Sequence, residues 1–228
     1  MTVTSSTLFR AAAGAAVLAG LIFIGVQINH PYLDATSITT TDVITRSSLK
    51  MLMAALSLVG ITGIYLRQVT KIGVLGLLGY VLFAAGYLSI FGTEFVAALV
   101  LPSIADTANA YTNNVIAFAN NRPATGYIGL MHTAILFTAV TYLAGGFIFA
   151  IALFRANVLA RWAAVLLALG TLATIAVGLV PQYERLFAFP TGLALVALGY
   201  SLWRAQRAPA SPPVATLVSS KLDAVGAK

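Results

Sequence analysis

The sequence contains no cysteine and only two histidines, His30 and His132. Without cysteine there can be no disulfide bond, no thiolate nucleophile, and no zinc or iron–sulfur site with thiolate ligands. Two histidines also leave few nitrogen ligands for a metal ion or a haem. We therefore predict no metal site and no cofactor. A haem between the two histidines, or a metal site that adds Glu94, is the alternative that these residue types leave open.

Charged residues are scarce as well. They make up 8% of the 228 residues, whereas 60% are hydrophobic. A soluble domain has about a quarter charged residues, so this composition is typical of a membrane protein. The formal net charge is +7, but the basic residues occur singly near predicted helix ends and not on one stripe. We therefore expect membrane lipid and a hydrophobic small molecule as partners, and no nucleic acid.

Long apolar runs are abundant, and prolines or charged turns separate them. An α-helix needs about 20 apolar residues to cross the hydrocarbon of a bilayer. The runs predict an all-α bundle of about six transmembrane helices within residues 1–204. These helices are predicted at 11–29, 43–66, 72–101, 125–154, 162–180 and 186–203. Residues 205–228, rich in Ala, Pro, Ser and Val, are predicted to be a disordered cytoplasmic tail.

The distribution of lysine and arginine predicts the orientation. With the N-terminus inside, four of the thirteen basic residues lie outside: Arg46, Lys50, Arg122 and Arg185. The nine on the inner side are Arg10, Arg67, Lys71, Arg155, Arg161, Arg204, Arg207, Lys221 and Lys228. Because cytoplasmic loops are enriched in Lys and Arg, we predict that both termini are cytoplasmic. The predicted location is a bacterial inner membrane.

Four polar residues fall inside or at the end of predicted membrane helices. Ionisable groups are costly in a bilayer, so each is a candidate functional residue. Glu94 and His132 are predicted about 10 Å below the outer ends of their helices, and Lys50 about 12 Å. Gln27 lies within one turn of the end of the first helix. All four therefore belong to one layer in the outer half of the bundle.

Two interpretations of this layer stay open. In the structural one, Lys50 and Glu94 form an ion pair, and His132 and Gln27 complete a network that holds the helices together. In the functional one, these groups line a cavity that opens to the outer face or to lipid. Glu94 is then the proton donor or acceptor, and His132 and Lys50 adjust its proton affinity.

Aromatic residues recur every three or four positions in the third predicted helix, which places them on one helix face beside Glu94. Such a face predicts the wall of an apolar pocket for a flat or isoprenoid ligand, since aromatic rings also stabilise cationic species. Packing between helices or contact with lipid is the alternative. The predicted substrate-binding residues are Gln27, Tyr80, Phe83, Tyr87 and Phe91.

Glycines indicate where helices approach each other. Gly73, Gly76 and Gly79 form a stripe of small residues that predicts close helix packing. A Gly145-Gly146 pair could break the fourth predicted helix, as in the binding sites of some transporters. The segment 102–126, which contains Tyr111 and several asparagines, is predicted to be a solvated loop, with a lid as the alternative.

Two resemblances extend these predictions. Residues 152–164 (ALFRANVLARWAA), with Gln27 and His30-Pro31, resemble small multi-pass membrane proteins of high-GC bacteria, which implies the same topology. Glu94 beside the aromatic face resembles the site of the integral-membrane terpene cyclases. That resemblance implies a membrane-embedded acid that protonates a prenyl chain or an epoxide.

The predicted function is therefore an outer-half cavity that binds a hydrophobic small molecule. Its most specific form is acid–base chemistry on an isoprenoid-like substrate, a cyclase or isomerase activity with Glu94, His132 and Lys50 as catalytic residues. The alternatives are a transporter or channel, a structural or accessory membrane subunit, and a bis-histidine haem protein.

Overall fold

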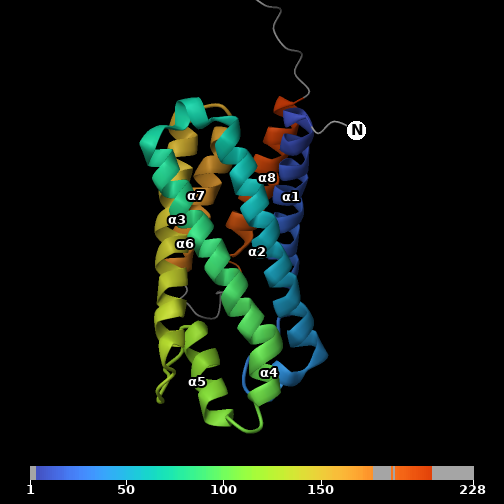
Figure 1. Ribbon diagram of the computed structural model, residues 1–228, viewed down its shortest axis with the longest axis vertical. Coiled ribbons are helices and arrows are strands. Elements are labelled where there is room, and N and C mark those ends of the chain that lie inside the picture. Colours follow the sequence, from blue (N-terminus) through green and yellow to red (C-terminus); the bar gives the residue numbers. More distant parts are fainter. Residues whose placement is uncertain (1–3, 177–185, 187, 207–228) are drawn as a thin grey trace, which may run out of the picture.

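The computed structural model describes residues 4–176, 186 and 188–206, and these residues contain helices but no strand (Figure 1). The long helices are α1 (Ser5–Gly25), α2 (Thr41–Arg67), α3 (Val69–Phe95), α6 (Leu130–Ala156), α7 (Arg161–Ala176) and α8 (Ala188–Ala205). The short ones are the 3-10 helix η1 (Ser37–Thr39), the π-helix η2 (Val96–Val100), α4 (Leu101–Ile104) and α5 (Asn109–Ala119). The all-α prediction is confirmed for this part of the chain.

Four helical segments are long and apolar enough to span a membrane: α1, α2, the continuous Val69–Ile104 segment, and α6. The protein is therefore membrane-embedded. The fifth and sixth predicted spans correspond to α7, which is shorter within the described residues, and to α8. Residues 177–180 and the predicted tail from 207 onward lie outside the described residues, and a total of about six spans stays a prediction.

The six long helices form a closed ring. Each packs against its neighbours in the order α1, α2, α3, α6, α7, α8, and α8 closes the ring against α1 (Figure 1). The interior is filled by buried side chains from around the ring, including Ala16, Ile64, Phe149 and Leu198. The start of α1 and the end of α8 lie at the same end of the molecule (Figure 1).

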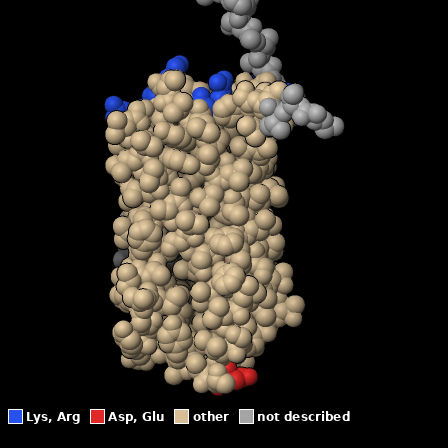
Figure 2. Space-filling view, in the orientation of Figure 1, with Lys and Arg blue, Asp and Glu red and all other residues tan. Residues whose placement is uncertain are grey.

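Charges separate toward the two ends of this bundle. One end, called the basic end below, contains the turns and helix termini with Arg10, Arg67, Lys71, Arg155, Arg161 and Arg204. The face in Figure 2 shows lysine and arginine at that end and acidic side chains at the opposite end. The opposite end contains α4, α5 and the linker between α1 and α2, and is called the cavity end below (Figure 1).

Close helix contacts occur at glycines, and the predicted stripe has one at Gly79. This residue packs on the backbone of Phe149 in α6. Gly73 has a φ of 64° and marks a kink near the start of α3, where an added Cβ would meet nothing. An added Cβ at Gly76 would meet the side chain of Ile72 in its own helix. Sequence spacing alone therefore did not show which helix face carries the contact.

Helix α6 is continuous through Gly145 and Gly146, so the break that the transporter alternative would need at this pair is absent. Both glycines instead allow close packing, since an added Cβ at Gly145 would collide with the backbone of Phe83. At Gly146 it would collide with the side chains of Phe83 and Thr171. A broken-helix transport site at this point is therefore excluded.

Candidate functional site

A large cavity lies toward the cavity end. Its lining residues come from α2, α3, η2, α4, α5, α6, the α1–α2 linker and the loop that follows α5. Its volume is about 1200 Å³, and most of its lining residues are apolar. Typical small-molecule pockets measure about 300–1000 Å³, so this cavity has room for a lipid-sized ligand. The space-filling view shows a hollow on the displayed face, in the half of the molecule nearer the cavity end (Figure 2). The polar lining side chains include Ser47, Lys50, Thr93, Glu94, His132 and Thr138.

Lys50 and Glu94 form an ion pair within this wall. Lys50 Nζ of α2 lies 3.4 Å from Glu94 Oε1 of α3, and both side chains are about one-fifth exposed (19% and 20%). The predicted ion pair is therefore present. Because both groups also line the cavity, the pair offers one donor and one acceptor to a ligand.

Glu94 lies immediately before a change of helix type. Residues Val96–Val100 form a π-helix, and Pro102 follows in the first turn of α4. Proline has no amide hydrogen and its ring displaces the carbonyl four residues earlier, so Pro102 disfavours a regular α-helix at Ala98. π-Helical turns are frequent at functional sites. Val96 and Ala97 of this π-helix line the cavity together with Glu94.

His132 also lines the cavity, in the first turn of α6, and not about 10 Å into the helix as predicted. The prediction was wrong because α6 begins at residue 130 and not at 125. Pro123 and the positive φ of Gly129 (60°) keep the preceding residues out of the helix. The side-chain oxygen of Asn114 also holds that segment by accepting the amides of Thr125 and Gly126 at 2.8 and 2.9 Å.

Helix α5 covers the cavity, so the predicted solvated loop is wrong for this segment. Val115 and Ile116 are buried, and the ring of Phe118 stacks on His132 with a centroid distance of 4.4 Å. Tyr111 donates a hydrogen bond of 3.5 Å to the carbonyl of Ile128. The sequence did not predict this helix because asparagine is typical of turns and loops. Here the asparagine side chains bond the helix itself, as Asn120 Nδ2 does to Ile116 O at 2.8 Å.

The predicted aromatic residues lie elsewhere in the bundle. Phe83 and Tyr87 are fully buried between α3 and α6, where they contact the rings of Tyr142 and Phe149. Tyr80 stacks on Tyr65 at 4.6 Å, and its hydroxyl lies 2.9 Å from that of Thr62. These three residues, Phe91 and Gln27 are not among the residues that line the cavity. Their proposed role in substrate binding stays a prediction.

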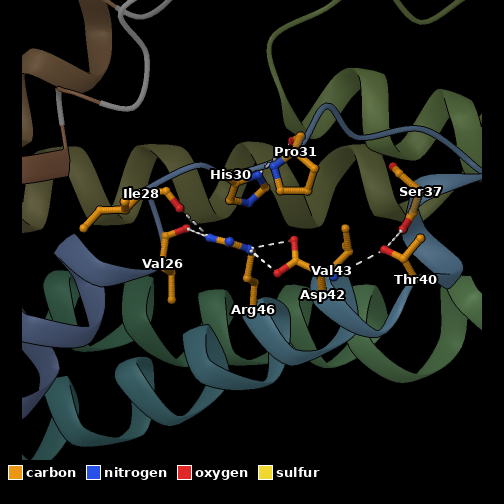
Figure 3. Close-up of polar contacts among 9 residues, drawn as sticks. All are labelled: Val26, Ile28, His30, Pro31, Ser37, Thr40, Asp42, Val43 and Arg46. Atoms are coloured by element: carbon orange, nitrogen blue, oxygen red, sulfur yellow. Dashed lines mark hydrogen bonds and ion pairs between the residues drawn. The ribbon is translucent and has the colours of Figure 1, made fainter.

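The linker between α1 and α2 is held by Arg46, which was predicted only to lie on the outer side (Figure 3). Arg46 Nη1 donates to the carbonyls of Val26 and Ile28 at 3.0 and 2.9 Å, and its Nε lies 3.0 Å from the Asp42 carboxylate. The spacing of four residues between Asp42 and Arg46 indicates the ion pair, but only the fold shows the link to α1.

The same linker approaches the loop after α5. Arg122 Nη2 donates to the carbonyl of Leu33 at 2.6 Å, and its guanidinium lies 4.4 Å from the centre of the Tyr32 ring. The amide of Ala35 donates to the side-chain oxygen of Asn113 at 2.8 Å. The α1–α2 linker therefore closes the cavity end together with α5.

Asp34 orders the start of this linker. Its Oδ1 accepts the amides of Ser37 and Thr36 at 2.7 and 2.9 Å. The hydrogen bond from the Ser37 amide is the largest influence that holds the pKa of Asp34 below its ordinary value of 3.8. The Thr36 amide and the guanidinium of Arg122 lower the pKa further, while slight burial acts in the opposite direction.

Among the described residues, no group of three or more His, Cys, Asp or Glu side chains is placed to hold a metal ion. His132 stacks on Phe118, and His30 Nδ1 lies 2.9 Å from the carbonyl oxygen of Pro31 (Figure 3). His30 is not among the residues that line the cavity. The geometry therefore gives no particular support to the haem or metal alternative.

No family model, curated protein or solved structure matches this chain. The resemblances to small membrane proteins of high-GC bacteria and to membrane terpene cyclases therefore stay expectations from the sequence.

Proposed function

We propose that this membrane protein binds a lipid-soluble small molecule with a polar end in its outer-half cavity. The observation that carries the proposal is a cavity of about 1200 Å³ with apolar walls and one inward-facing ion pair, Lys50–Glu94. Apolar walls favour a hydrocarbon body, because its burial removes apolar surface from water or headgroups. A few placed polar groups then fix the orientation of the ligand.

The polar end of the ligand is proposed to lie between the Lys50–Glu94 pair and His132, which face the same cavity from different helices. Because the ammonium and carboxylate balance each other, this pair favours an uncharged carbonyl, hydroxyl or epoxide over an ion. His132 adds a ring nitrogen as a further donor or acceptor. An isoprenoid-like molecule with such an end fits these requirements.

Acid–base chemistry on that molecule is the narrower form of the proposal, with Glu94 as the acid. It requires a Glu94 oxygen to reach an alkene or epoxide, whereas in the structure Glu94 Oε1 is engaged by Lys50 Nζ at 3.4 Å. The geometry therefore supports binding more directly than it supports a cyclase or isomerase reaction.

The orientation is proposed to place the basic end in the cytoplasm of a bacterial cell and the cavity end outside. The separation of lysine and arginine toward the end with the N-terminus supports this arrangement (Figure 2). Since the chain has no cysteine, a single introduced cysteine shows which side of the membrane its position faces. A membrane-impermeant maleimide should label Asn109→Cys in intact cells and Thr70→Cys only after lysis, and the reverse pattern would invert the orientation.

Native mass spectrometry of the purified protein tests the binding proposal. The wild type should retain an added hydrophobic mass that Glu94→Gln loses or holds less tightly. Asp106→Asn makes the same change of acid to amide outside the cavity lining and should keep the added mass. A bare polypeptide in all three samples would instead support a structural role for the Lys50–Glu94 layer. A retained haem mass would support the histidine alternative.

A further inference from the structure

Four hydroxyl groups from four helices meet inside the ring, away from the predicted catalytic residues. They belong to Ser57 of α2, Tyr87 of α3, Tyr142 of α6 and Thr191 of α8, and are called the hydroxyl cluster below. Each hydroxyl oxygen is completely buried, and none has a hydrogen-bond partner among the described residues. The residues themselves are at most 8% exposed.

These hydroxyls adjoin one another. The rings of Tyr87 and Tyr142 meet edge to face with a centroid distance of 5.7 Å. The Tyr87 hydroxyl interacts with those of Ser57 and Tyr142, and the Tyr142 hydroxyl also interacts with that of Thr191. None of these approaches has the geometry of a direct hydrogen bond. The four hydroxyls therefore lie next to one another, but direct contacts between them do not satisfy their hydrogen-bonding capacity.

Such an arrangement is unfavourable unless something bridges the hydroxyls. A buried polar group that loses its water without gaining a partner destabilises the folded state, and this applies to each of the four here. Buried polar groups in native proteins are nearly always bonded to protein or to ordered water. A buried water typically makes about two to four hydrogen bonds, so the four converging hydroxyls supply enough partners for one.

We propose that the hydroxyl cluster is a binding site for an internal water molecule that links α2, α3, α6 and α8. Hydroxyl groups both donate and accept, as a water molecule requires. A metal cation would need carboxylate or carbonyl oxygens, and no Asp or Glu side chain belongs to the cluster.

Polar side chains on α3 and α6 lie between the cavity and the hydroxyl cluster. Thr138 lines the cavity and lies 2.6 Å from the hydroxyl of Ser89, measured between the two oxygens. Tyr142 follows Thr138 by one turn of α6, so the two side chains lie on the same helix face. Polar side chains thus extend along α6 from Thr138 in the cavity lining to Tyr142 in the hydroxyl cluster. This inference does not depend on which ligand the cavity binds.

Removal of single hydroxyls distinguishes a bridged cluster from an unsatisfied one. If a water joins them, Tyr87→Phe and Tyr142→Phe should each lower the midpoint of thermal unfolding, by about 2–4 °C for a loss of one net hydrogen bond. If the hydroxyls have no partner, the same variants should raise the midpoint, because an unsatisfied group is removed. Tyr200→Phe, at an exposed position, is the matched control and should leave it unchanged.

X-ray radiolysis in H₂¹⁸O detects the water itself, because radicals formed from a bound water modify the side chains beside it. Tyr87 and Tyr142 should be oxidised despite their burial, and Phe149, also fully buried, should be modified much less. Equal, low modification of all three residues would overturn the proposal, even if the variants lower the unfolding midpoint, since the hydroxyls would then bond one another directly. A raised midpoint in the variants would overturn it as well.

Discussion

Gly86 of α3 lies against the backbone of Tyr142 on α6, so that a β-carbon added at Gly86 would come 2.8 Å from the Cα of Tyr142. Real β-carbons do not approach other atoms so closely, and backbone cannot move aside as a flexible side chain can. The contact lies beside the cluster of Phe83, Tyr87 and Tyr142. The contact between Gly86 and Tyr142 therefore sets the distance between α3 and α6 next to the cavity.

Gly86→Ala should destabilise the protein by forcing α3 and α6 apart. Overpacking of this kind typically costs about 1–3 kcal/mol. Gly92→Ala in the same helix is the matched control, since an added β-carbon there meets nothing within 4 Å. The control should leave stability unchanged or raise it, because alanine favours helix more than glycine does. Thermal unfolding in detergent measures both, and equal midpoints would contradict the tight contact.

The Lys50–Glu94 pair should behave as a coupled unit. Lys50→Met and Glu94→Gln each leave a partly buried charge without its partner, which should lower the free energy of unfolding by about 1–3 kcal/mol. The double variant removes both charges and should lose less than the sum of the two single losses. Denaturant titration of the four proteins gives the coupling. Strict additivity would show that the ion pair contributes nothing.

The sequence predicted most of the fold because hydrophobic length is a strong signal in membrane proteins. The predicted runs overlap α1, α2, α3, α6, α7 and α8, with ends displaced by a few residues. The observed helix ends differ from the predicted ones where a polar capping residue determines the end. Helix α1 begins at Ser5 and not at 11, since the Thr4 hydroxyl accepts the amide of Thr7 at 3.2 Å. Apolar length alone does not locate such caps.

The candidate site was predicted in part. Glu94 and Lys50 were predicted as candidates because charged residues are rare in membrane helices, and the two side chains form an ion pair. The aromatic face did not reveal which helix it contacts, because a ring packs equally well against lipid, a ligand or α6. Phe118 was missed altogether, since it belongs to an asparagine-rich segment that the sequence indicated as a loop and that packs over the cavity as a helix. Tertiary contacts decided both outcomes.

Arg46→Met should loosen the linker between α1 and α2. The change removes the bonds to the carbonyls of Val26 and Ile28 together with the contact to Asp42. We expect faster hydrogen–deuterium exchange in residues 26–40 and a loss of about 1–3 kcal/mol. Asp42→Asn is the companion variant: it keeps the bonds to α1 and removes an ion pair whose acid is 55% exposed, so its effect should be small. Similar exchange in both variants would assign the order of the linker to the ion pair.

Acid should open the turn that Asp34 organises. The folded pKa of Asp34 lies below its ordinary value of 3.8, so its stabilising effect is present above that value and is lost as the pH falls through the folded pKa. Amide protection factors of Thr36 and Ser37 should therefore fall between about pH 5 and pH 2.5. Asp34→Asn keeps an oxygen acceptor but does not titrate, so its protection factors should stay level. A parallel fall in both proteins would assign the effect to another group.

Access to the cavity should depend on the contact between Phe118 and His132, which stack at 4.4 Å. Because the chain has no cysteine, Thr93→Cys places a single thiol in the cavity wall. Phe118→Ala removes a large ring from the α5 cover, so a polar maleimide should react severalfold faster with this thiol in the Phe118→Ala background. Ala150→Cys, buried in the helix core outside the cavity, should stay unreactive in both backgrounds. An unchanged rate at Thr93→Cys would mean that reagents enter by another opening. A parallel rise at Ala150→Cys would mean that the variant loosens the whole bundle.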